Sequence, residues 1–185
     1  ACKKEESSPN SATSTSLDGF GNRGGTPSGS SFHFPSYITL ASPVQWGSGN
    51  FSDYEVHGVG NILLDLSLKN TMKANVTMTL PAGLIFVSNN DSSQSGLSIC
   101  PTTLTFSPYE SKNVMLRCFC MNHDKNTYRQ TVYDKSVISD NDQVVKLINA
   151  VKVKSRIVLL YHINKLGDIV WDISDGPGLT RSEEH

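Results

Sequence analysis

The sequence lacks both long apolar runs and an excess of charge. No segment approaches the about 18 consecutive apolar residues that a membrane-spanning helix needs, so any membrane attachment is expected to be covalent. The 16 Lys and Arg residues are balanced by 17 Asp and Glu, which gives a formal net charge of -1. Without a basic stripe, nucleic acid is not expected as a partner. The 185 residues suffice for one domain with a tail.

The first six residues combine a cysteine with a run of charged side chains. Cys2 follows the small residue Ala1 and precedes a charged, Ser-rich stretch. This start resembles the lipobox of a bacterial lipoprotein, in which the cysteine is acylated. Lys4, Glu5 and Glu6 resemble a known export signal, Lys-(Asp/Glu)-(Asp/Glu). This signal directs lipoproteins of Bacteroidetes-type bacteria to the outer face of the outer membrane. The resemblance implies a lipid anchor on Cys2 in the outer membrane, with the domain exposed at the cell surface. The alternative is an ordinary cysteine at the second position.

Composition divides the chain into a tail and a domain. Residues 3–33 are dominated by Ser, Gly, Thr, Asn and Pro. Such a segment has too little apolar surface to offset the entropy of ordering it. We therefore expect a disordered, lipid-anchored tether over residues 1–33, a folded domain over 34–176, and a frayed C-terminus over 177–185.

Short apolar segments separated by Gly, Pro and Asn dominate the first part of the domain. Residues 61–69 alternate, with Ile62, Leu64, Leu66 and Leu68 on one face, which is the period of a half-buried strand. Similar segments are expected to form strands at residues 37–40, 54–56, 75–80, 84–87, 97–99, 103–106 and 113–120. This series predicts an antiparallel β-sandwich over residues 35–135.

Helical spacing replaces the alternation near residue 140. Val144, Leu147 and Val151 recur at the period of a helix that Ser139 or Asp140 could cap. Two further apolar stripes predict helices around residues 157–163 and 166–173, with a break near Val153 and Ser155. The predicted core, combined from strands and helices, consists of Leu64, Leu66, Val76, Met78, Leu84, Phe86, Phe106, Leu116, Ile148 and Trp171.

If Cys2 carries lipid, three cysteines remain for other roles. Outside the cytoplasm a disulfide is permitted. Cys118 and Cys120 lie two apart on one face of a strand and are poorly placed to bond each other. A bridge from Cys100 to one of them is therefore one expectation. Three reduced, buried cysteines are the other.

Residues 118–124 contain the one dense cluster of potential metal ligands or nucleophiles. Zinc would need a second ligand pair at a matching spacing, and none is present. Cys120 and His123 are close, but neither a nucleophile elbow nor an orienting acid accompanies them. We therefore predict no metal site, no cofactor and no catalytic residue, and keep a cysteine-dependent enzyme using Cys120 as an alternative.

Four features occur in order along the chain: the turn Leu80-Pro81-Ala82-Gly83, Gln94 in a polar loop, the strand end Phe119-Cys120-Met121-Asn122, and a helical end from Ile169 to Gly176. Over residues 60–176 this order resembles an uncharacterised class of bacterial surface β-sandwich domains. The strand end at Phe119-Cys120 and the helix around Trp171 also resemble thioester domains of surface adhesins, where a Cys thiolate and a Gln carboxamide join. Aligning on Trp171 places Gly167 where that Gln is required, so no thioester is expected there. Gln94 could substitute, but it precedes the cysteine, contrary to the family's order. Trp171 is interpreted as a core anchor.

These observations favour a non-catalytic, lipid-anchored binding or adhesion module for a protein or glycan ligand at the cell surface. A structural or accessory subunit of an envelope or pilus-like assembly is the first alternative. A cysteine-dependent enzyme, or a covalent, thioester-like adhesin that uses Cys120, is the second.

Overall fold

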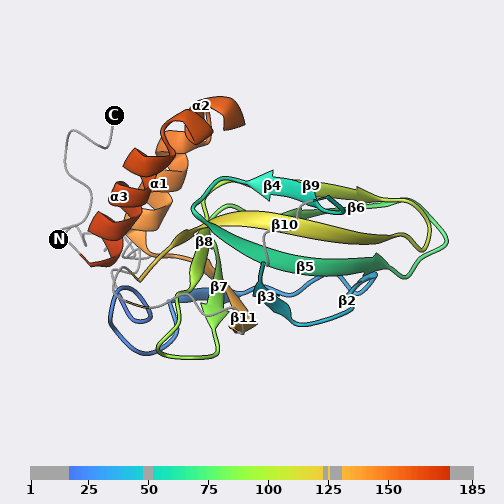
Figure 1. Cartoon of the computed structure of the whole chain (residues 1–185), viewed down its shortest axis with the longest axis horizontal. Helices are drawn as coiled ribbons and strands as arrows, with labels where there is room; N and C mark the ends of the chain where they lie inside the picture. Colours follow the sequence, from blue (N-terminus) through green and yellow to red (C-terminus); the bar gives the residue numbers. More distant parts are fainter. Residues whose placement is uncertain (1–16, 48–51, 123–124, 126–130, 176–185) are drawn as a thin grey trace, which may run out of the picture.

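The computed structural model of the chain describes residues 17–47, 52–122, 125 and 131–175. Within these residues, strands come first and helices follow, which confirms the prediction of a mainly β chain with C-terminal helices (Figure 1). The strands are β1 (Gly29–Ser31), β2 (Ile38–Leu40), β3 (Val44–Trp46), β4 (Glu55–Gly58), β5 (Ile62–Asn70), β6 (Val76–Leu80), β7 (Leu84–Ser88), β8 (Gly96–Ser98), β9 (Thr102–Phe106), β10 (Ser111–Cys120) and β11 (Val132–Ser139). The helices are α1 (Asp142–Val151), α2 (Arg156–Tyr161) and α3 (Ile163–Ser174).

The main sheet closes on itself. Its ring order is β5, β3, β11, β7, β8, β10 and back to β5, and the β5–β10 seam runs from Lys69 opposite Ser111 to Ile62 opposite Cys118. Strands β1, β2 and β4 extend from this ring, and β6 and β9 form a separate two-stranded sheet. A six-strand barrel thus replaces the predicted β-sandwich, because β3 and β11, two strands that the sequence analysis did not predict, join the two sides.

Strand alternation fills the barrel. The inward positions of β5 are buried, and they pack with side chains from the opposite wall, such as Phe86, into one cluster that we call the barrel core. The two-stranded sheet adds Met78 and Phe106 to this cluster, so it covers the barrel rather than standing apart. Of the predicted core residues, seven are buried: Leu64, Leu66, Met78, Leu84, Phe86, Phe106 and Leu116. Three are half-buried against a core: Val76, Ile148 and Trp171.

A second cluster, the helical core, lies between the barrel wall and the helices. Phe119 and Ile85 point outward from the barrel and pack with Leu147 of α1 and Ile169 of α3. Strand β7 is therefore buried on both faces, which explains why residues 84–87 are continuously apolar rather than alternating. Figure 1 shows the three helices gathered at one end of the barrel, with the long strands β5 and β10 running away from them.

The folded domain begins earlier than predicted. Phe20 is only 1% exposed and belongs to the helical core, and the Gly21 N–H donates to the Met121 carbonyl at 3.0 Å. Strand β1 pairs with β11, with Gly29 opposite Ser139. The predicted boundary at residue 34 is therefore wrong for residues 17–33. A single buried aromatic and backbone pairing fix this segment despite its Gly- and Ser-rich composition.

The helices follow the predicted order with shifted ends. Asn141, rather than Ser139 or Asp140, caps α1: its side-chain oxygen accepts from the N–H groups of Gln143 and Val144. Ser155 caps α2 and so confirms the predicted break near that residue. The third helix begins at Ile163, earlier than its apolar stripe indicated.

Candidate functional site

The segment that runs from α1 through α2 to the start of α3 is rich in positively charged residues. Residues 143–167 include no Asp or Glu, although acidic residues slightly outnumber basic ones in the whole chain. The same segment holds five cationic residues, namely Lys146, Lys152, Lys154, Arg156 and Lys165. This run could be read from the sequence, but our sequence analysis weighed only the net charge of the whole chain and missed it.

A cavity of about 300 Å³, which we call the basic pocket, opens where this segment meets the barrel. Val59, Ile99 and Leu159 supply its apolar lining. Cationic and hydroxyl-bearing side chains complete the lining, contributed by His57, Thr102, Thr103, Lys152, Lys154 and Arg156. Among the described residues that line the pocket there is no carboxylate, so the pocket favours an anionic ligand.

The fold holds Arg156 and His57 in place. The Arg156 Nε donates to the Gly58 carbonyl at 3.1 Å, which fixes the guanidinium where the chain enters α2. The His57 Nε2 lies 3.3 Å from Glu55 Oε2. Glu55 also forms an ion pair with Lys112 at 2.6 Å, and neither residue of this pair lines the pocket. The planar guanidinium of Arg156 is suited to carboxylate, sulfate or phosphate groups.

Cys100 is half-buried in the wall of the basic pocket. Burial raises the pKa of its thiol, and the nearby charge of Arg156 only partly offsets this. The thiolate is the nucleophilic form of cysteine, so a raised pKa disfavours Cys100 as a catalytic nucleophile. Its role here is to line the pocket.

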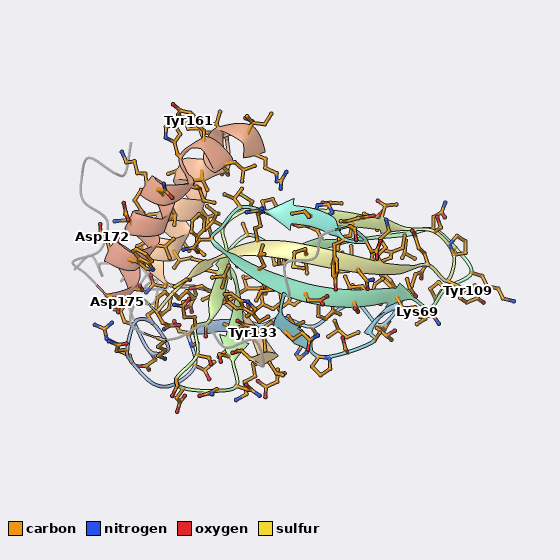
Figure 2. All side chains as sticks on the ribbon, in the orientation of Figure 1. Lys69, Tyr109, Tyr133, Tyr161, Asp172 and Asp175 are labelled. Carbon is orange, nitrogen blue, oxygen red and sulfur yellow. The ribbon has the colours of Figure 1, made fainter. Side chains whose placement is uncertain are left out.

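A set of exposed apolar side chains stands beside the basic pocket. Val153 is 76% exposed, Ile157 80% and Tyr161 85%. We call these three residues the apolar ridge. Figure 2 places Tyr161 at the outer tip of the helical end, far from Lys69 and Tyr109 at the opposite end of the barrel. Behind the ridge, a groove of about 350 Å³ runs between the helices, with Lys154 and Lys165 among its lining residues.

The predicted site residues fall into two groups. The anchor and export residues Cys2, Lys4, Glu5 and Glu6, and the predicted frayed C-terminus at 177–185, lie outside the described residues. Cys100, Cys118 and Cys120 are described, and all three are free thiols. Cys118 and Cys120 point into the barrel core, whereas Cys100 packs against the helical core. The alternation of β10 therefore directs the expected bridging partners away from the cluster that holds Cys100.

Cys120 does not have the surroundings of a nucleophile. It is 3% exposed, and burial raises the pKa of its thiol, which contacts with Asn122 and Trp171 only partly offset. The Cys120 thiol donates weakly to the Asn122 carbonyl at 3.7 Å. His123 lies outside the described residues, so the pairing of Cys120 with His123 is not described.

A thioester with Cys120 would need a glutamine carboxamide, and the carboxamide of Gln94 is engaged elsewhere. The Gln94 amide donates to the Lys125 carbonyl at 2.7 Å. At Gly167, the position that our sequence alignment compared with the Gln of the adhesins, an added Cβ would lie 3.9 Å from the ring of Phe119. Cys120 lies beside Trp171, and Gly167 has no carboxamide to offer.

Comparisons with known proteins assign no relationship. No protein-family model matches the chain, and no curated protein or solved structure matches it significantly. No helix in the described ranges has the length and apolar character needed to cross a membrane. Across those same ranges, His, Cys, Asp and Glu side chains form no group of three or more that could hold a metal ion.

Proposed function

We propose that this chain is a non-catalytic binding module of the cell surface, which binds an acidic group of a protein or glycan ligand in the basic pocket. The observation that carries the proposal is the lining of that pocket. Three cationic residues, Lys152, Lys154 and Arg156, line a cavity whose described lining includes no carboxylate. A carboxylate, sulfate or phosphate group entering it would gain charge-assisted hydrogen bonds.

A sulfated oligosaccharide derived from heparin is a suitable probe, with a neutral maltooligosaccharide as the reference. We expect calorimetry to detect binding of the sulfated probe alone, with an affinity that falls as salt screens the charges. The triple substitution K152A/K154A/R156A should weaken binding about tenfold or more.

The matched control removes three lysines from the barrel, K69A/K73A/K135A, which are exposed and outside the pocket. It should leave the affinity unchanged. Equal loss in both variants would mean that net charge alone drives the interaction, and no loss in the pocket variant would overturn the proposal.

The surface location is proposed from the N-terminal resemblance. Acylation of Cys2 would hold the module on the outer membrane, and Lys4, Glu5 and Glu6 would direct it outward. In a chain expressed with its signal peptide, Cys2→Ala should move the protein out of the membrane fraction. Alanine at the three export positions should keep it there while removing its accessibility to external protease. Membrane retention of the Cys2→Ala form would contradict the anchor.

Burial of the thiols supports the non-catalytic part of the proposal. In the native state, iodoacetamide should label Cys100 faster than Cys118 or Cys120, because the latter two are buried in the barrel core. The intact mass should show no deficit of about 17 Da, the ammonia that thioester formation expels. Rapid labelling of Cys120, or such a deficit abolished by Cys120→Ala, would favour the enzyme or covalent-adhesin alternatives instead.

A further inference from the structure

The apolar ridge has no role in the basic pocket. Ile157 and Tyr161 lie one turn apart on α2, and Val153 lies in the turn that leads into this helix. None of the three lines the pocket. Each is at least three-quarters exposed, so these side chains project from the surface instead of packing into it. Ile157 and Tyr161 thus present two exposed apolar side chains on one side of a helix, which is typical of a contact surface.

Cations flank the ridge on both sides along the chain. Lys152 and Lys154 adjoin Val153, and Lys165 lies one turn beyond Tyr161 in α3. All three side chains are exposed. Exposed Asp168 follows Lys165 by three residues, but among the described residues no carboxylate forms an ion pair with any of these three lysines. The partner that complements the ridge therefore has negative charge around an apolar interior.

We propose that the apolar ridge inserts into the headgroup region of an anionic lipid bilayer, an interaction beyond ligand binding in the basic pocket. Projecting side chains need a partner that can deform around them, and a bilayer interface does so. Ile157 would reach the acyl boundary, and Tyr161 suits the interface with its apolar ring and polar hydroxyl. The flanking lysines attract anionic headgroups.

The place where the chain enters the fold is consistent with this orientation. Leu17, the first described residue, packs against the helical core, at the same end of the molecule as α2. If Cys2 is acylated, the segment from Cys2 to Leu17 spans at most about 50 Å. The anchor would then hold the helical end near the bilayer and raise the local concentration of lipid around the ridge. Only this step depends on the proposed anchor.

Flotation of the full, unacylated chain with vesicles tests the insertion. We expect it to bind vesicles of phosphatidylcholine mixed with phosphatidylglycerol and not vesicles of phosphatidylcholine alone. Ile157→Ser with Tyr161→Ser should weaken binding about tenfold or more, because two apolar side chains no longer leave water. Unchanged binding by this variant would overturn the proposal.

A fluorescence measurement separates insertion from simple charge attraction. Tyr161→Trp adds an indole at the tip of the ridge, and Tyr109→Trp adds one at the far end of the barrel, where Tyr109 is 51% exposed. Lipids carrying a nitroxide quencher near the headgroup should quench the added emission at position 161 and not at 109. Equal quenching at both positions would also overturn the proposal.

Two further outcomes distinguish membrane insertion of the apolar ridge from self-association and from ligand binding in the basic pocket. If the wild type self-associates in sedimentation, the serine variant is monomeric, and neither binds vesicles, the ridge is a contact between copies and the membrane proposal is wrong. The serine variant should keep full affinity for the sulfated oligosaccharide, because the ridge does not line the pocket. Failure of vesicle binding alone therefore leaves the proposed ligand pocket standing, and failure of oligosaccharide binding alone leaves the membrane contact standing.

Discussion

On the barrel, Lys112 lies 2.6 Å from Glu55 and 3.7 Å from Glu110. At the helical end, Lys152 instead bonds the neutral side chain of Asn149 at 3.0 Å. Apolar groups differ in the same way: Phe86 is fully buried within the barrel, whereas Ile157 is 80% exposed on α2. The barrel pairs Lys112 with carboxylates and encloses Phe86, whereas the helical end leaves Lys152 bonded to a neutral amide and Ile157 exposed.

This contrast separates stability from binding along the chain. The barrel core is built from strands on all sides and closed by the β5–β10 seam, so its side chains have few ways to relax after truncation. Removing exposed side chains of α2 creates no cavity. Changes in the two regions should therefore affect different measurements, and the predictions below are arranged by the size of their expected effect.

The largest effect is expected in the barrel core. Phe86→Ala should lower the free energy of unfolding by about 3 to 5 kcal/mol, because it removes a fully buried ring and leaves a cavity. Its counterpart at the helical end, Ile157→Ala, should change stability by no more than about 0.5 kcal/mol. Urea unfolding followed by circular dichroism measures both. Comparable losses would show that the two regions do not differ as described.

Phe20→Ala tests whether the N-terminal segment belongs to the helical core. The ring is 1% exposed, and its loss should cost about 3 kcal/mol, at the lower end for a buried aromatic because the adjoining Gly-rich loop can partly collapse. Ser30→Ala, at an exposed position of the same segment, serves as the control. An unchanged urea midpoint for Phe20→Ala would restore the domain boundary to residue 34.

Phe20 also shows where sequence reasoning stopped. Its neighbours along the chain are Asp18, Gly19, Gly21 and Asn22, so composition indicated a tether. Its burial depends instead on packing with residues about 100 positions away, such as Met121. By contrast, the alternation in β5 and the helical stripe of α1 are local patterns, and both were predicted. Local periods reveal an element but not what packs on it.

Barrel closure was missed for a similar reason. Strand β3 has three residues, too few for a period to be visible. Strand β11 contains an irregularity between Tyr133 and Lys135, which breaks the alternation. These two strands join β5 to β7, so missing them left a series of strands that indicated a sandwich.

The candidate site was readable only in part. The run of cations without acids from residue 143 to 167 is a local pattern that a segment-by-segment charge count would find. The other walls of the basic pocket include His57 and Cys100, which lie roughly 100 and 50 residues earlier in the chain. Only the fold brings them to the helices.

A smaller effect is expected at the start of α1, which carries the chain from barrel to helical end. Asn141→Ala removes the acceptor for two backbone N–H groups and should lower the free energy of unfolding by about 1 kcal/mol. Asn164→Ala, at an exposed position of α3, should change it by no more than about 0.5 kcal/mol. Equal effects in thermal or urea unfolding would mean that the cap contributes nothing beyond helix propensity.

The smallest effect is expected for the Glu55–Lys112 ion pair on the barrel. The Lys112 ammonium holds the pKa of the Glu55 carboxyl below its ordinary value, and the same hydrogen bond raises the pKa of Lys112. A lowered carboxyl pKa adds stability above the unfolded pKa, about 4.3, and this stability is lost as pH falls through the folded pKa. Because Glu55 is 46% exposed, the pair contributes no more than about 1 kcal/mol.

Glu55→Gln should therefore lower stability slightly at pH 7, and the difference from wild type should disappear once the pH falls below the lowered pKa of Glu55, where both side chains are neutral. High salt should shrink the difference at pH 7, because the pair is partly exposed. Urea unfolding across this pH range provides the measurement. A difference that persists at low pH would show that Gln perturbs packing. The Glu55–Lys112 ion pair of the barrel would then make no measurable contribution to stability, and its contrast with Lys152 would have no effect on the folding free energy.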